Sequence, residues 1–459
     1  MYKINFETPV HVHFIGIGGI SMSGLAEILL KEGFTISGSD NKETALTDHL
    51  ETLGATIFYG QKASNIISGI DVVVYTAAIH EDNEEFMEAK HQNLPMLSRA
   101  ELLGQLMTNY EMPIAISGTH GKTTTTSMLS HILLAGEKDP TISVGGILKA
   151  IGGNIRVGES GYFVTEACEY TNSFLHFFPK ISVILNIDED HLDFFKDLDD
   201  IRNSFHKFAK LLPSDGILII NDNIPDLDDF LSDLNCNIIK YGNNSSLDYS
   251  ATNIFHNNLG EVSFDLVKSG EFIDRISLSV NGDHNVSNAL AAIAVADQLD
   301  IPLEAIKNGL KEFHGTDRRF EHKGEVNGVN IIDDYAHHPT EIKATLTAAS
   351  QYPHKELWCI FQPHTYTRTK ALFPEFVEAL TYADHIILAD IYAARETDTL
   401  GISSADIAEK LKEKGCDAYY FPSFEEIETF CLDKCKKGDM LITMGAGDVV
   451  NIGESLLKR

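Results

Sequence analysis

Residues 118–124, Gly-Thr-His-Gly-Lys-Thr-Thr, have the composition of a phosphate-binding loop. They follow an apolar segment, 112–117, and precede a second apolar stretch with helical spacing. Glycines let backbone N–H groups turn toward phosphate oxygens, Lys122 adds positive charge, and Thr123 offers a hydroxyl to Mg²⁺. The loop is shortened, because Ile116 stands where the strict pattern has its first glycine. The pattern predicts a site for ATP and Mg²⁺ made by Gly118, Thr119, His120, Gly121, Lys122, Thr123 and Thr124.

Acidic and imidazole side chains follow the next two predicted strands. Glu166 ends one apolar segment, and His191 comes shortly after another, 181–186. Open parallel sheets bind ligands at the carboxyl ends of their strands. Alone, such a pattern is typical of a solvated acidic turn. Behind a phosphate loop it indicates a divalent-cation site made by Thr123, Glu166 and His191.

Further polar groups begin helices or end strands toward the C-terminus. Asn285 and Asn288 lie one helical turn apart, so both amides can face one ligand such as an adenine edge, although helix capping explains Asn285 equally well. Arg319 is suited to clamping phosphate. Segments 333–339 and 362–369 carry His and Asp residues, which suit either a metal or the sugar and phosphates of a nucleotide.

A second glycine-rich turn follows the first predicted strand. It resembles the dinucleotide fingerprint G-x-G-x-x-G, with a serine in place of the last glycine. The following helix N-terminus suits a pyrophosphate, and an acidic residue ends the next strand about where a ribose hydroxyl would lie. The candidate residues are Gly16, Gly18, Gly19, Ser21 and Asp40.

Strands and helices alternate along most of the chain, which predicts an α/β fold of three domains. We expect a Rossmann-like domain over 1–108, a central phosphate-loop ATPase-like domain over 109–313, and a second Rossmann-like domain over 314–459. The expected strands are 12–15, 34–40, 55–58, 71–76, 112–117, 161–165, 181–186, 217–221, 328–333, 357–361, 385–388 and 439–443, with added strands within 243–282 and a closing helix at 286–299.

Composition excludes several classes of protein. The formal net charge of −31 over 459 residues argues against nucleic acid or an anionic membrane as the main partner. No apolar run reaches the ~18 residues that span a bilayer, and the N-terminus lacks a signal-peptide core. The cysteines form no C-x-x-C pair, so we expect reduced thiols in the cytoplasm at Cys168, Cys236, Cys359, Cys416, Cys431 and Cys435.

Taken together, these residues resemble the Mur ligase family over nearly the whole chain. The order of the motifs is far more specific than any one of them. The matching segments are 118–125, the Glu166 segment, Asp190-His191, His284 to Asn288, Arg318-Arg319-Phe320 and Asp334 to His337.

The resemblance implies a UDP-sugar site, an ATP site with Mg²⁺, and a mobile third domain that carries the groups around the reacting carboxylate. It further implies that L-alanine is joined to the lactoyl carboxylate of UDP-N-acetylmuramate through an acyl phosphate, with His338 as candidate base. The protein is expected to be a monomer or a homodimer. By motif, the residues expected to contact UDP are Gly16, Gly18, Gly19 and Asp40, and those expected to contact ATP are Lys122, Asn285, Asn288, Arg319 and Asp334. Mg²⁺ is expected at Thr123, Glu166 and His191, and the reacting carboxylate and alanine near His338, His364 and Arg368.

Two departures and three alternatives stay open at this stage. Cys168-Glu169-Tyr170 replaces the Asp-Glu-Ser of some relatives, which leaves the muramoyl contacts near 168–173 undetermined. The position of a carbamylated lysine in other branches falls on His206, so none is expected. The alternatives are a ligase that recycles ready-made peptides, a nicotinamide-dependent dehydrogenase and a non-catalytic nucleotide switch.

Overall fold

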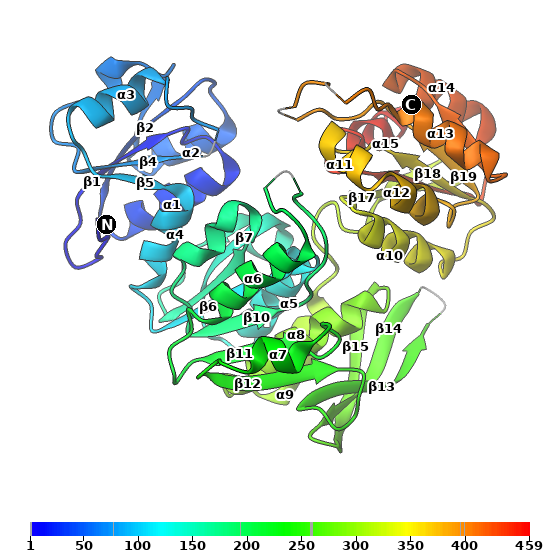
Figure 1. Ribbon diagram of the computed structural model, residues 1–459, viewed down its shortest axis with the longest axis horizontal. Helices are drawn as coiled ribbons and strands as arrows, with labels where there is room; N and C mark the ends of the chain where they lie inside the picture. The colour runs from blue at the N-terminus through cyan, green and yellow to red at the C-terminus, as the bar shows by residue number, and fades with distance from the viewer. Residues whose placement is uncertain (1, 77, 193, 258–259, 395, 399) are drawn as a thin grey trace.

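The computed structural model describes residues 2–459 except 77, 193, 258–259, 395 and 399. Three sheets follow one another along the chain, and each is covered by helices. Figure 1 shows the N-terminal sheet in blue and the C-terminal sheet in yellow to red on either side of the central one. The predicted α/β fold with three parallel-sheet domains is confirmed.

The N-terminal sheet is parallel, and its strand order β3-β2-β1-β4-β5 reverses direction at β1. The chain leaves β1 toward β2 on one side and later returns to β4 on the other, so the carboxyl end of β1 opens into a crevice. The glycine-rich turn at residues 16–19 occupies this position. The elements are β1 (His11–Ile15), α1 (Ile20–Lys31), β2 (Thr35–Asp40), α2 (Ala45–Thr52), β3 (Thr56–Tyr59), β4 (Val72–Tyr75), α3 (Glu84–His91), β5 (Met96–Ser98) and α4 (Arg99–Met107).

The central sheet has ten strands, and β6 lies between β10 and β9 in its parallel part. The loop after β6 therefore lies beside the ends of both neighbours. β13 to β15 extend the sheet with antiparallel pairing. The elements are β6 (Met112–Ser117), α5 (Lys122–Ala135), β7 (Thr141–Leu148), β8 (Gly153–Arg156), β9 (Tyr162–Ala167), β10 (Ile181–Ile184), α6 (Leu198–Ala209), β11 (Ile217–Asn221), α7 (Leu227–Leu231), β12 (Asn237–Gly242), β13 (Tyr249–His256), β14 (Glu261–Lys268), β15 (Glu271–Asn281), α8 (His284–Gln298) and α9 (Leu303–Glu312).

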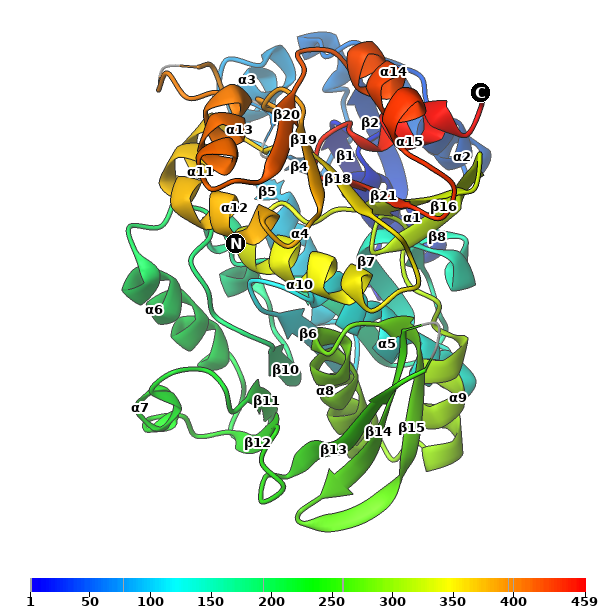
Figure 2. The ribbon, with the colours of Figure 1, turned by 90° about the vertical axis from the view of Figure 1, so that its right-hand side faces the viewer.

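The C-terminal sheet has the order β16-β17-β21-β18-β19-β20, and only β16 pairs antiparallel among its described strands. In Figures 1 and 2, α10 lies on the side of this domain that faces the central one. The elements are β16 (Glu321–Val326), β17 (Val329–Asp334), α10 (Pro339–Ser350), β18 (Leu357–Phe361), α11 (Tyr366–Ala371), α12 (Phe373–Leu380), β19 (His385–Leu388), α13 (Ser404–Glu413), β20 (Asp417–Tyr420), α14 (Phe424–Lys434), β21 (Met440–Met444) and α15 (Val450–Leu456).

Burial explains which elements the sequence pattern predicts well. β6, β11, β18 and β19 have the predicted bounds, because each is an apolar run covered on both faces. β16 was not predicted, since its sequence Glu-His-Lys-Gly-Glu-Val lies at a partly exposed sheet edge. Over the described residues, none of the helices is long and apolar enough to cross a membrane.

Candidate functional site

The phosphate loop joins β6 to α5 and needs glycine at two positions. Gly118 and Gly121 have φ values of 145° and 84°, in the left-handed half of conformational space. A Cβ atom on Gly121 would lie 2.6 Å from the side-chain oxygen of Asn288. The N-terminal turn of α8 therefore packs directly onto the loop, which brings the predicted Asn285–Asn288 pair to the predicted phosphate site.

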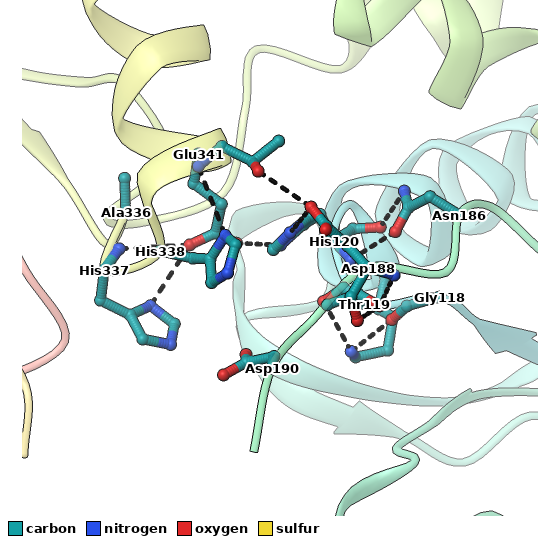
Figure 3. Close-up of polar contacts among 12 residues, drawn as sticks. Gly118, Thr119, His120, Asn186, Asp188, Asp190, Ala336, His337, His338 and Glu341 are labelled. Atoms are coloured by element: carbon teal, nitrogen blue, oxygen red, sulfur yellow. Dashed lines mark hydrogen bonds and ion pairs between the residues drawn. The ribbon is translucent and has the colours of Figure 1, made fainter. Parts of the chain in front are cut away.

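The end of β10 anchors the loop through reciprocal hydrogen bonds. The His120 N–H donates to Asn186 Oδ1 over 2.8 Å, and Asn186 Nδ2 donates back to the His120 carbonyl over 3.0 Å. The Asp188 N–H donates to Thr119 Oγ1 over 2.9 Å. Figure 3 shows these contacts from the loop to the segment after β10. The loop and the segment that leads to His191 are thus held as one unit.

Lys122 lies against a carboxylate that the sequence analysis did not select. Its Nζ is 3.0 Å from Glu169 Oε2, and His191 Nε2 is 3.7 Å from Glu169 Oε1. Only 2% of the Glu169 side chain is exposed. Burial lowers the pKa of Lys122, but the charge of Glu169 outweighs it, so the pKa is raised and the ammonium persists. Glu169 is therefore the carboxylate that the structure brings together with Lys122 and His191.

Glu166 lies on the neighbouring side of the loop. It pairs in register with Ile116 on β6, and its Oε1 accepts a hydrogen bond of 2.6 Å from the Gly145 N–H of β7. The next residue of β7 is close to Thr123, since a Cβ on Gly146 would lie 3.2 Å from Thr123 Cγ2. The structure thus sets Glu166 against β7, and its charge adds to that of Glu169 in raising the pKa of Lys122. Its role as a metal ligand stays a prediction.

His191 is held in an uncommon backbone conformation. Its φ is 53°, and its ring stacks on Tyr170 at a centroid distance of 4.5 Å. Burial lowers the pKa of His191, which favours the neutral imidazole that a metal requires. Asn172 and Thr171, in the turn that carries Tyr170, also have positive φ values of 56° and 55°. The unusual Cys-Glu-Tyr segment therefore supplies both the carboxylate and the aromatic support of this site.

A cavity of about 990 Å³ extends from the phosphate loop to the C-terminal domain. Its volume suits a ligand as large as a nucleotide. The Asn288 amide donates to Asn285 Oδ1 over 3.0 Å, and Asn285 donates to the Asn281 carbonyl over 2.7 Å. The predicted ATP residues that line this cavity are His120, Gly121, Thr124, Asn285, Asn288, Arg319 and Asp334.

Asp334 and the two neighbouring arginines have different environments. The Asp334 carboxylate accepts hydrogen bonds of 2.7 Å from the Phe320 and Ala336 N–H groups, while burial raises its pKa to about 6. Arg319 lies with its guanidinium 5.2 Å from the Tyr335 ring, at the cavity. Arg318 instead bonds to Asp333 over 3.0 Å and to two backbone carbonyls. Arg318 therefore stabilises the C-terminal domain, whereas Arg319 lines the cavity, where its Nη1 lies 3.9 Å from Glu341 Oε1.

The predicted substrate groups of the C-terminal domain converge on the segment after β10. Arg368 Nη2 lies 2.8 Å from Asp190 Oδ1, and its Nη1 lies 3.2 Å from His364 Nδ1. His338 Nε2 donates to the Glu189 carbonyl over 2.7 Å, and its Nδ1 accepts from the Thr340 N–H over 3.3 Å. In this conformation both nitrogens of His338 are engaged. Its predicted role as a base requires the Glu189 contact to open.

The N-terminal turn is hydrogen-bonded to the end of β2. Gly16, with φ of 85°, donates from its N–H to the Ser39 carbonyl, and the Gly18 N–H donates to Asp40 Oδ2 over 2.8 Å. Gly19 caps α1. The guanidinium of Arg99 donates to Ser21 Oγ over 3.1 Å.

The Arg99 guanidinium was missed because α4 is remote in sequence from the turn. Burial lowers its pKa, and none of the described carboxylates forms an ion pair with it. The turn therefore has a half-buried cation beside it.

The fold and the site define a three-domain α/β enzyme with a phosphate loop where the central and C-terminal domains meet. Family models agree along the chain: "Mur ligase family, catalytic domain" matches residues 11–111, "Mur ligase middle domain" 116–296, and "Mur ligase, glutamate ligase domain" 318–447. The chain belongs to the Mur ligase family.

Several curated relatives and solved structures match the chain over nearly its whole length. UDP-N-acetylmuramate–L-alanine ligases of Lachnospira eligens and Agathobacter rectalis are each 60% identical over 459 residues, which cover all of both chains. Among solved structures, UDP-N-acetylmuramate-alanine ligase from Thermotoga maritima has a TM-score of 0.81 at 30% identity, over 98% of this chain and 99% of the other. A murein peptide ligase from Psychrobacter arcticus has a TM-score of 0.71 at 26% identity, over 98% of each chain.

Proposed function

We propose that this protein joins L-alanine to the lactoyl carboxylate of UDP-N-acetylmuramate at the expense of ATP. The products are UDP-N-acetylmuramoyl-L-alanine, ADP and phosphate, a step in the synthesis of peptidoglycan precursors in the cytoplasm. The observation that carries the proposal is the 60% identity over the whole chain to ligases with this name. We assign one glycine-rich turn to each nucleotide: residues 16–19 to the sugar nucleotide and residues 118–121 to ATP.

The chemistry explains why the phosphate loop must lie near the sugar site. A carboxylate does not accept an amine readily, because hydroxide or oxide would have to leave. Attack of the carboxylate on the γ-phosphorus breaks the bond to the β,γ-bridging oxygen and gives an acyl phosphate and ADP. Phosphate then leaves when the alanine amine attacks the acyl carbon. Both reactants of the first step are anions, so Lys122, the loop N–H groups and the N-terminus of α5 offset the charge that accumulates.

The donors near the loop fit a magnesium ion. Thr123 offers a hydroxyl at the start of α5, Glu169 a nearly fully buried carboxylate, and His191 an imidazole whose pKa is lowered by burial. We propose these three as the groups that would hold Mg²⁺, with Glu166 as a second acid on the β7 side. When bound, the ion would neutralise phosphate charge.

The remaining predicted residues divide between the two other substrates. We place the UDP diphosphate at Gly16, Gly18, Gly19 and Ser21, where Arg99 supplies the positive charge that the turn itself lacks. We place L-alanine near His364 and Arg368, with His338 as the base that accepts a proton from its ammonium. Domain closure over these groups would keep water from the acyl phosphate.

The proposal is tested by product analysis with purified protein. UDP-N-acetylmuramate, ATP and Mg²⁺ are incubated with L-alanine, glycine, L-serine or the L-alanyl-D-glutamyl-diaminopimelate tripeptide, and products are identified by mass spectrometry. We expect UDP-N-acetylmuramoyl-L-alanine to form fastest. Faster transfer of the tripeptide would instead establish a peptide-recycling ligase, and ATP hydrolysis that ignores both other substrates would contradict ligation.

A further inference from the structure

The imidazole of His120 lies between two carboxylates that come from different domains. Its Nδ1 is 3.2 Å from Glu341 Oε1 on α10, and its Nε2 is 3.4 Å from Asp188 Oδ2 after β10. Only 13% of the His120 side chain is exposed. Figure 3 shows His120 between these two residues. Nδ1 is hydrogen-bonded to Glu341, whereas Nε2 has no hydrogen-bond partner among the described residues and meets Asp188 only as an ion pair. Two carboxylates beside one ring favour its charged form.

The other groups around His120 leave that charge in place. Burial lowers the pKa of His120, but the polar contacts and charges of Asp188 and Glu341 outweigh it and raise the pKa from 6.5 to about 9. The ring of His338 faces His120 at 4.7 Å, and burial lowers the pKa of His338, so that neighbour is neutral. Glu341 also faces other cationic or titratable groups, namely Arg319 at 3.9 Å and His337 at 3.3 Å.

Three further contacts cross the same junction and end on residues 188–190. Thr340 Oγ1 donates to Asp188 Oδ2 over 2.9 Å, and His338 and Arg368 bond to the next two residues. His120 differs from these because it belongs to the phosphate loop itself. Glu341 lines the same cavity as the loop. One imidazole therefore links the loop, the segment after β10 and the C-terminal domain.

We propose that His120 is a positioning residue, which holds α10 of the C-terminal domain against the phosphate loop through Glu341 and thereby completes the ATP pocket. The inference rests on the proposed function, since it takes ATP as the occupant of the pocket. The charge of His120 stabilises the contact between α10 and the phosphate loop fully below pH 6.5. This stabilisation is lost as the pH rises through about 9.

A double-mutant cycle on nucleotide affinity tests the link between the two domains. A non-hydrolysable ATP analogue with Mg²⁺ is titrated into the wild type, His120→Gln, Glu341→Gln and the double variant. We expect each single change to weaken binding about tenfold and the double variant to weaken it by about tenfold as well, which is a coupling of about tenfold. Losses that multiply to roughly a hundredfold would overturn the proposal. If Glu341→Gln unfolds, Glu341→Asp, which shortens the side chain and keeps its charge, takes its place in the cycle.

The pH dependence of the same affinity separates positioning from a general structural role. Wild-type affinity should fall between pH 8 and 10 with a midpoint near 9. His120→Gln should abolish this fall, and Glu341→Gln should move its midpoint to lower pH. His337→Gln is the matched control, because His337 contacts Glu341 within the C-terminal domain, and the wild-type midpoint should remain. A fall that persists in His120→Gln contradicts the proposal. A wild type that binds the analogue but forms no alanyl product contradicts the proposed function instead.

Discussion

The two glycine-rich turns of this molecule both connect a strand to a helix, but different side chains surround them. Each follows a strand that has parallel neighbours on both sides and leads into a helix, at residues 16–19 before α1 and at 118–121 before α5. In the N-terminal turn, an N–H is already bound to Asp40, and the cation comes from Arg99 on another helix. In the central loop, Lys122 follows the turn directly and meets Glu169, with His191 beyond it.

The different side chains around the two turns suit the N-terminal turn to binding a diphosphate and the central loop to transferring a phosphoryl group. Backbone N–H groups and one fixed cation suffice to hold a diphosphate that does not change. Transfer of a phosphoryl group also requires groups that compensate moving charge, and these gather only around the central loop of the two. In a chain of net charge −31, both sites must assemble this positive potential locally.

The largest effect is expected from Lys122→Ala. Removing the Lys122 ammonium takes away the positive charge at the start of α5, so kcat/KM should fall by roughly 10³-fold or more, about 4 kcal/mol of transition-state stabilisation. Steady-state phosphate release measures the loss. UDP binding to the N-terminal turn should be unchanged, and a loss below tenfold would erase the distinction between the two turns.

Glu169→Gln and Glu166→Gln form the next test, as matched changes on two sides of one loop. Glu169 contacts both Lys122 and His191, whereas Glu166 is bound to a backbone N–H of β7. We expect a loss in kcat of roughly 10²-fold at Glu169, with a raised Mg²⁺ requirement, and a smaller loss at Glu166. Titration of Mg²⁺ in the phosphate-release assay compares the kcat and the Mg²⁺ requirement of the two variants. A larger loss at Glu166 would indicate that Glu166, and not Glu169, is the metal ligand.

Arg99→Met tests the cation of the N-terminal turn. Because none of the described carboxylates pairs with Arg99, its loss should weaken UDP and UDP-N-acetylmuramate equally, by about tenfold, while the KM for ATP stays constant. Calorimetric titration with uridine, UDP and the full sugar nucleotide measures this, and Arg99→Lys should retain part of the affinity. Weakening confined to the full sugar nucleotide would place Arg99 at the lactoyl carboxylate instead.

The smallest effect is expected from Gly18→Ala. A Cβ there would lie 2.8 Å from Asp40 Oδ2, which is the end of a rotatable side chain, so Asp40 can move. The KM for UDP-N-acetylmuramate should rise about threefold to tenfold, with kcat little changed. An equal loss in kcat would show that the N-terminal turn takes part in the reaction itself.

Buried strands and contiguous loops were predictable from the sequence, and contacts across domains were not. β18 and β19 are apolar runs with the expected bounds, whereas the edge strands β16 and β20 carry polar residues and were missed. The class of fold and the membership of the Mur ligase family follow from local patterns in a fixed order. The sheet order and the antiparallel edge required the structure.

In the site, too, residues of one continuous segment were predictable, and contacts between distant segments were not. Lys122 and Thr123 were predictable because the loop that carries them is continuous. Glu169 was passed over for Glu166, since it lies beyond the strand end, next to residues with positive φ that no local pattern indicates. The contact of His120 with Glu341 joins residues 221 positions apart, which only the packing of two domains brings together.

The transfer of oxygen from the sugar nucleotide to phosphate tests the central claim most directly. UDP-N-acetylmuramate labelled with ¹⁸O in both carboxylate oxygens is converted with ATP and L-alanine, and the released phosphate is examined by mass spectrometry. Attack of the carboxylate on the γ-phosphorus predicts one ¹⁸O atom in each phosphate. Phosphate without the label, formed together with the alanyl product, would contradict an acyl phosphate formed at the Lys122 loop.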